Sequence, residues 1–231
     1  MMSKKKIKVK VKKRRVKMKR IILCLIIFVL ICLVIYYISK LPIKNIYVIG
    51  NNILSDKEVM EEADISNYPS FWATNSYSIK KKLENNVYIE EVSVKKKFFN
   101  KLYIYIIEKK IICSYDGKLL LEDGAEVKND YGITNYPILT SSVDNIKSKF
   151  AEKFSIVDSS ILLKISEIEY VPNNVDSERF ALKMNDGNLV YITLNKIEKI
   201  NKYNSIYSSL DGKRGIVYLD SGDYVEIKEE W

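Results

Sequence analysis

The chain has 231 residues, of which 47% are hydrophobic and 29% charged, with only 8 Gly and 4 Pro, and this composition excludes wholesale disorder and collagen-like repeats. It holds no histidine, which excludes an imidazole base, a histidine metal ligand and a histidine pH switch. The net charge of +9 arises at one end, because residues 1–20 carry twelve Lys or Arg and no acid, while the other 211 residues together carry −3.

The first predicted element is a transmembrane helix of eighteen residues that contains no charge, amide or glycine. It begins at Ile21, passes Phe28 and ends at Ile38, and these apolar residues are the predicted membrane anchor. A cleavable signal peptide is the less favoured alternative, because the run is long and Tyr37 occupies the place of the small residue before a cleavage site. A soluble core helix would show polar residues at helical spacing, and this run shows none.

The charges on either side of the span predict its orientation. Twelve cationic residues precede it, whereas the short stretch after it offers only Lys40 and Lys44. The positive-inside rule therefore places the N-terminus in the cytoplasm and everything after residue 39 outside. A Lys/Arg run can also bind nucleic acid or anionic lipid, but topology explains the charges with no further assumption, so no nucleic-acid partner is expected.

The next stretch, residues 43–107, predicts the order β-α-α-β-β. Ser55-Asp56-Lys57-Glu58 has the form of a capping box, which starts a helix. Alternating apolar residues and β-formers predict the two later strands as a hairpin. The expected elements are a strand at Ile43–Ile49 ending in Gly50-Asn51-Asn52, helices at Asp56–Ala63 and Ser78–Asn85, and strands at 91–95 and Leu102–Ile107 joined by Phe98–Lys101.

Short strands separated by Asp-Gly turns follow from Ile111 onward and predict a meander. The turns lack the alternating acidic spacing and closing Glu of a calcium loop, so no metal is expected there. The expected later elements are helix within 141–160, strands at Ile165–Tyr170, Phe180–Met184 and Leu189–Leu194, a helix at Lys196–Leu210, and extended segments at Ile216–Leu219 and Tyr224–Lys228.

This first stretch after the span resembles a POTRA domain. The resemblance lies in the strand ending in Val-Ile-Gly-Asn-Asn, the capped helix, the second helix and the hairpin closing on Ile107-Glu108-Lys109. Behind a basic tail and a single span, this arrangement resembles the FtsQ/DivIB family of bacterial cell-division proteins. The stretch Tyr136–Thr140 resembles the entry to that family's β domain. The chain departs from the family pattern at Phe99 and Ile111, where a Pro is usual, and it lacks an Arg after Leu219.

The expected fold class is α+β, with a single N-terminal transmembrane helix, a POTRA domain (β-α-α-β-β) and a mainly antiparallel β domain with flanking helices. The expected division is a basic cytoplasmic tail at 1–20, the span at 21–38, the POTRA domain at 42–110 and the β domain at 111–231, whose last strands bind partners.

The resemblance implies an assembly protein of the cell membrane at the division septum, which helps to control septal peptidoglycan synthesis. Its implied partners are the extracytoplasmic segments of bitopic coiled-coil division proteins of the FtsB/DivIC and FtsL types, besides the lipid bilayer. No cofactor and no small-molecule substrate are expected.

The predicted partner-binding surface is a sheet edge near the C-terminus, whose free backbone groups can pair with an incoming strand. Tyr218 and Tyr224 are the aromatic anchor candidates, although ordinary sheet packing would also account for them. The full predicted set is Ile216, Tyr218, Leu219, Asp220, Tyr224, Val225 and Ile227.

An enzymatic function is not expected, since no short motif singles out a nucleophile and no glycine-rich oxyanion turn accompanies a serine. The alternative is a membrane-anchored serine hydrolase of the Ser/Lys dyad type, which needs no histidine. Cys113, the one thiol outside the span, is read as a small buried apolar residue.

The charge asymmetry around the span predicts the result of a protease experiment. Protease added to intact spheroplasts should remove the chain after Lys40 and spare the basic tail, because only the part after the span is outside. Immunoblotting with antibodies to each part measures the outcome, and protection of the large domain would contradict this topology.

Overall fold

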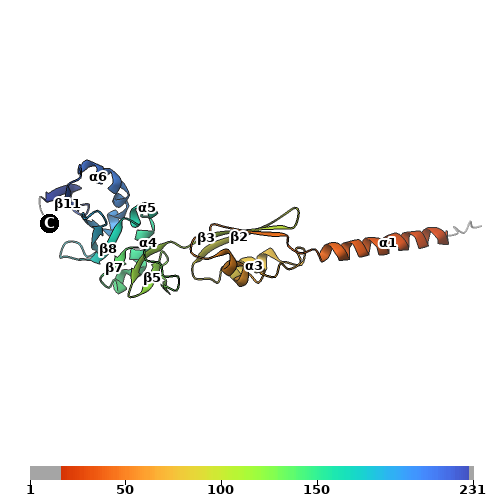
Figure 1. The fold of residues 1–231 in the computed structure, drawn as a ribbon. Coiled ribbons are helices and arrows are strands. Elements are labelled where there is room, and N and C mark those ends of the chain that lie inside the picture. The colour runs from red at the N-terminus through yellow and green to blue at the C-terminus, as the bar shows by residue number, and fades with distance from the viewer. Residues whose placement is uncertain (1–16, 229–231) are drawn as a thin grey trace, which may run out of the picture.

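The computed structural model describes residues 17–228 (Figure 1). The predicted basic tail lies outside the described residues up to residue 16. Helix α1 (Met18–Ser39) is 22 residues long, and none of its residues is buried; Ile21, Phe28 and Ile38 are exposed. It is long and apolar enough to cross a bilayer. Figure 1 shows it at one end of the chain, with the C-terminal strands at the other.

The first module, from β1 to β3, has the predicted β-α-α-β-β order. Its elements are β1 (Asn45–Ile49), α2 (Asp56–Glu62), α3 (Ser76–Leu83), β2 (Ile89–Lys97) and β3 (Lys101–Glu108). The sheet order is β1-β3-β2, with β1 parallel and β2 antiparallel to β3. Apolar residues of both helices pack on one face of this sheet, among them Val59, Ile79 and Leu83.

Both helices of this module begin at side-chain caps. The predicted capping box is confirmed, since the Ser55 hydroxyl accepts the Glu58 amide and the Glu58 carboxylate accepts the Ser55 amide. Helix α3 begins two residues earlier than expected, because the Asn75 side chain accepts the amide of Tyr77 and so starts the helix at Ser76.

The turn after β1 is held by a residue at the end of β3. The Glu108 carboxylate accepts the amides of Asn52, Ile53 and Leu54 at 2.7–3.1 Å. Gly50 lies in the same turn at φ +95, and a Cβ there would stand 2.1 Å from the Ile106 carbonyl oxygen. These two contacts explain why the turn carries Gly and the strand end carries Glu.

The second module, from β4 to β12, holds nine strands in the order β12-β11-β10-β9-β8-β7-β4-β5-β6. Five of the eight strand pairs are antiparallel and three are parallel. The strands are β4 (Ile111–Tyr115), β5 (Lys118–Leu121), β6 (Glu126–Lys128), β7 (Ile138–Leu139), β8 (Ile165–Tyr170), β9 (Arg179–Met184), β10 (Leu189–Thr193), β11 (Arg214–Tyr218) and β12 (Tyr224–Lys228).

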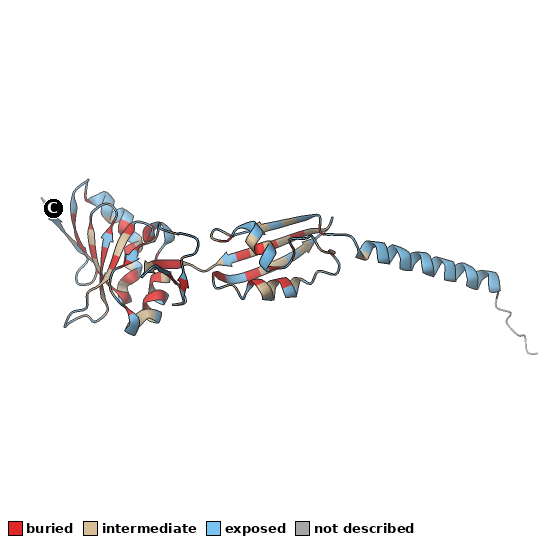
Figure 2. Cartoon of the chain, turned by 60° about the horizontal axis from the view of Figure 1, so that its bottom comes forward, coloured by how far each residue is buried: buried red, intermediate tan, exposed pale blue. Residues whose placement is uncertain are grey.

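The helical segments of the second module share one core with the sheet. They are η1 (Asp144–Ile146), α4 (Lys147–Ser155), α5 (Ser159–Leu162), η2 (Leu194–Lys202) and α6 (Tyr203–Ser209). The rings of Phe150 and Phe154 both contact the ring of Phe180 and fix α4 against β9. Figure 2 shows the buried residues concentrated inside the two modules, whereas α1 is exposed.

The single α-helix expected at Lys196–Leu210 is wrong in its first half. Residues Leu194–Lys202 form a 3-10 helix, and only Tyr203–Ser209 is α-helical. The buried side chains of Leu194, Ile197, Ile200 and Tyr203 recur every third residue. That spacing matches the three residues per turn of a 3-10 helix, so the tighter helix keeps all four on the core.

The contact between Glu108 and the β1 turn predicts a stability change. Replacing Glu108 with Gln keeps the size of the side chain but removes the charge and points an amide donor at three backbone donors. We expect E108Q to lose about 1–3 kcal/mol of unfolding free energy. Urea unfolding of the full chain in detergent, followed by circular dichroism, measures this, and a variant as stable as the wild type would contradict the assigned role.

Candidate functional site

Strand β12 forms one edge of the nine-stranded sheet. It pairs antiparallel with β11, from Arg214 opposite Lys228 to Tyr218 opposite Tyr224. Within residues 17–228 no strand pairs with its other side. The outer side of β12 is therefore a free edge of the described sheet.

The hydrogen bonds of β11 determine which groups of β12 point outward. The amides of Gly215 and Leu219 donate toward β10, to the Asn188 side chain and the Tyr191 carbonyl. Successive amides of a strand point to opposite sides, so those of Ile216 and Tyr218 face β12. Their partners Glu226 and Tyr224 are then the hydrogen-bonded positions. The main-chain groups of Val225 and Ile227 consequently point away from the sheet.

The predicted partner-binding residues divide into an exposed and a buried group. Tyr224 and Ile227 lie on β12 with 52% and 48% of their surface exposed, and Val225 lies between them. Ile216 and Leu219 are buried behind the edge. The structure therefore brings only part of the predicted set to the surface.

Tyr218 and Tyr224 belong to a row of stacked rings across the sheet. The Tyr218 ring lies 4.7 Å from that of Tyr224 and 5.5 Å from that of Tyr191, measured between centroids. The guanidinium of Arg179 lies 3.8 Å from the centroid of the Tyr191 ring. The row links four strands and gives the edge a continuous aromatic face.

Sequence reasoning missed two members of this row. Tyr191 sits at an outward position of a predicted strand, where its alternation with Val190 and Ile192 was the available signal. Arg179 carried no signal, because its place beside Tyr191 depends on the pairing of β9 with β10.

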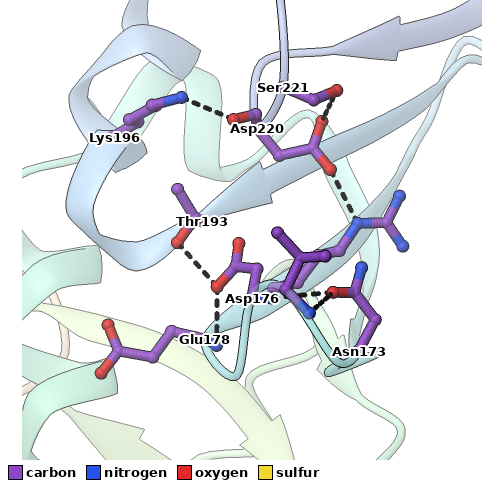
Figure 3. Close-up of polar contacts among 9 residues, drawn as sticks. Asn173, Asp176, Glu178, Thr193, Lys196, Asp220 and Ser221 are labelled. Atoms are coloured by element: carbon purple, nitrogen blue, oxygen red, sulfur yellow. Dashed lines mark hydrogen bonds and ion pairs between the residues drawn. The ribbon is translucent and has the colours of Figure 1, made fainter.

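Asp220, another member of the predicted set, holds the turn between β11 and β12. Its carboxylate accepts Arg179 Nε at 2.7 Å and the Ser221 hydroxyl at 3.0 Å, and its carbonyl oxygen accepts Lys196 Nζ at 2.5 Å (Figure 3). Burial raises the pKa of Asp220, but the hydrogen bonds and charge of Arg179, with the Ser221 bond, outweigh burial and hold the pKa below its usual value.

The loop between β8 and β9 reinforces the same corner. The Asp176 carboxylate accepts the Thr193 hydroxyl and the Glu178 amide, and the Asn173 side chain accepts the amides of Val175 and Asp176 (Figure 3). These bonds position Arg179 at the start of β9, where it reaches Asp220.

A groove of about 370 Å³ lies on the core-facing side of the edge. Val225 and Val217 form one wall, and Ile206 of α6 is part of the other. Lys199 Nζ donates to both oxygens of Asp223 at 2.7 and 2.6 Å, which ties η2 to the turn before β12. The groove offers apolar surface beside the outward main-chain groups of Val225 and Ile227.

In the described residues, little supports a reactive thiol, a metal site or a serine nucleophile. Burial raises the pKa of the Cys113 thiol to about 12, so it stays protonated at neutral pH. No cluster of acidic and cysteine side chains in residues 17–228 could hold a metal ion. Serine hydroxyls such as those of Ser114, Ser166 and Ser208 donate to backbone carbonyls.

Comparison with known proteins gives a match to the first module and matches to nearly the whole sequence. Residues 41–109 match the family model of the FtsQ-type POTRA domain. The cell division protein DivIB of Bacillus subtilis (strain 168) is 30% identical over 95% of this chain and 88% of its own length. DivIB of Bacillus anthracis is also 30% identical, over 94% of this chain and 86% of its own.

One solved structure also resembles the chain. It is the major extracytoplasmic domain of the trans isomer of DivIB from Geobacillus stearothermophilus, with 24% identity and a TM-score of 0.38. The match covers 45% of this chain and 95% of that chain.

The ion pair of Asp220 predicts a pH-dependent stability difference. D220N leaves the partly buried Arg179 without its charged partner, so we expect a loss of about 1.5–3 kcal/mol of unfolding free energy at pH 7. Folding lowers the pKa of Asp220, so the ion pair contributes its full share of the unfolding free energy above the unfolded pKa of about 3.9. This contribution is lost as the pH falls through the folded pKa.

Urea unfolding of the wild type and D220N from pH 7 to pH 3 measures this difference. S221A, which removes the hydroxyl donor but leaves the ion pair of Asp220 with Arg179 in place, is the matched control. A wild-type advantage that grew as the pH fell would contradict the assignment.

Proposed function

The chain belongs to the DivIB family of bacterial cell-division proteins, and from this premise we propose that it is an assembly protein of the division septum that binds and positions other membrane division proteins. It is a single-pass membrane protein. We further propose the orientation with the N-terminus in the cytoplasm, and a division into tail (1–20), span (21–38), POTRA domain (42–110) and β domain (111–231). Through its partners the protein would help to control septal peptidoglycan synthesis.

The observation that carries this proposal is the free edge at β12. An extended segment of a partner can add to it as a further strand and accept and donate hydrogen bonds at Val225 and Ile227. The exposed side chains of Tyr224 and Ile227 would give selectivity to an edge whose backbone supplies affinity. The proposed partners are the outer segments of coiled-coil division proteins of the FtsB/DivIC and FtsL types.

The position of the edge suits such partners. Strands β11 and β12 lie at the end of the molecule opposite α1 (Figure 1). A bitopic coiled coil standing on the same membrane carries its outer segment away from the bilayer, as this chain carries β12. Two elongated proteins anchored in one membrane can therefore meet far from the bilayer.

No observation favours the Ser/Lys hydrolase alternative, and we propose that the chain acts by binding alone. The lone thiol outside the span is buried and protonated. Lys110, whose pKa burial lowers, donates to the carbonyl oxygens of Ser155 and Val157 rather than to a serine hydroxyl.

A proline at an outward amide tests the docking strand. I227P removes one N–H from the free side of β12 and leaves the bonds of Glu226 to β11 in place. We expect affinity for a purified outer segment of the FtsB/DivIC type to fall at least about tenfold, which corresponds to roughly 1.4 kcal/mol. Titration calorimetry with the full chain in detergent measures it.

I227A is the matched control, because it removes the exposed side chain but keeps the backbone donor. It should weaken binding less than I227P if main-chain pairing supplies the affinity. Equal and full-strength binding by both variants, each folded by circular dichroism, would show that the docking surface lies elsewhere.

A further inference from the structure

The tip of the β2–β3 hairpin exposes aromatic side chains that the proposed function does not use. Phe98 and Phe99 are 91% and 82% exposed, and Trp72, in the segment before α3, is 60% exposed. Isolated apolar residues on a surface are ordinary, but three large aromatic side chains around one groove are not. The groove has a volume of about 640 Å³ and is lined by Trp72, Phe98 and Phe99 together with lysines.

This aromatic cluster is held at the end of the transmembrane helix. The Asn100 side chain donates to the Pro42 carbonyl at 3.1 Å, and the Lys44 amide donates to the Asn100 carbonyl at 2.8 Å. Ser70 donates to the carbonyl of Ser39, the last residue of α1, at 2.5 Å. Figure 1 shows the hairpin reaching toward the α1 end of the module. Pro42 follows Ser39 by three residues, so it lies at most about 11 Å from the end of α1.

The backbone conformation of the loop does not favour a phenylalanine at position 99. Phe99 and Asn100 both have positive φ, at +66 and +54. Asn tolerates this region and Gly adopts it freely, whereas a bulky aromatic residue there is strained. A side chain that costs turn stability and is 82% exposed points to a contact outside the chain.

The positive charges around the loop indicate that it contacts an anionic partner. Lys97 and Lys101 face each other across the strand pair at the base of the tip, and like charges directly opposite destabilise a hairpin. Within residues 17–228 no carboxylate pairs with either ammonium group. Lys97 lies 4.4 Å from the Tyr103 ring centroid instead. An anionic partner would remove this repulsion.

Aromatic rings beside lysines are the composition that proteins use at a membrane interface. We propose that the hairpin tip, with Trp72, is a second membrane contact that inserts Phe98 and Phe99 among the headgroups of anionic phospholipids next to the span. Two contacts, the helix and the tip, would then set the tilt of the first module on the bilayer. This role is independent of partner docking at β12, which lies at the other end of the molecule.

Fluorescence quenching by lipids with brominated acyl chains tests the contact in the full chain. The protein is placed in nanodiscs of phosphatidylcholine and phosphatidylglycerol, and W72F and W231F remove both native tryptophans. In this background F98W reports on the tip. V87W is the matched control, because Val87 is exposed and precedes β2, which separates it from the tip by roughly 26 Å.

We expect brominated lipid to quench F98W several times more strongly than V87W, with emission of F98W at shorter wavelength. The quenching should weaken in discs of phosphatidylcholine alone, and K97E/K101E should remove that dependence on lipid charge. Quenching of F98W no greater than that of V87W would overturn the proposal. So would shielding of F98W that arises only when a second division protein is added, since the tip would then be a protein-docking surface.

Discussion

A link of two residues, Lys109 and Lys110, joins the two modules, and the position of the β12 edge relative to the membrane helix depends on it. The Lys109 amide donates to the Tyr88 carbonyl of the first module, and the Lys110 amide donates to the Glu122 carboxylate of the second. Lys110 Nζ also donates to the Ser155 and Val157 carbonyls. A small apolar cluster that includes Tyr88 and Ile111 closes the junction. The link thereby holds strand β12 far from α1 (Figure 1).

The features that could be predicted from sequence are those that depend on neighbouring residues. The capping box of Ser55 and Glu58, the Gly50 turn and the strands of the first module follow from short patterns. The tighter helix at Leu194–Lys202 was missed because period three and period 3.6 differ little over nine residues, and only burial separates them.

The candidate site was predictable only in part, because its details depend on pairings between distant residues. Arg179 reaches Asp220 across 41 positions, and this pair fixes Asp220 in the turn before β12. The outward direction of Val225 and Ile227 is set by Asn188, whose side chain accepts the Gly215 amide. No local pattern specifies either relation, whereas the β-forming character of the last strand is local and was visible.

Strand addition at β12 is the central claim, and hydrogen exchange of single amides tests it most directly. The full chain in detergent is exchanged with and without the partner's outer segment, and backbone amides are followed by NMR or fragmentation mass spectrometry. Pairing predicts slower exchange at Val225 and Ile227 on binding, with Glu226 unchanged because it already bonds to β11. Protection confined to residues 45–108, with Val225 and Ile227 exchanging as before, would contradict the account.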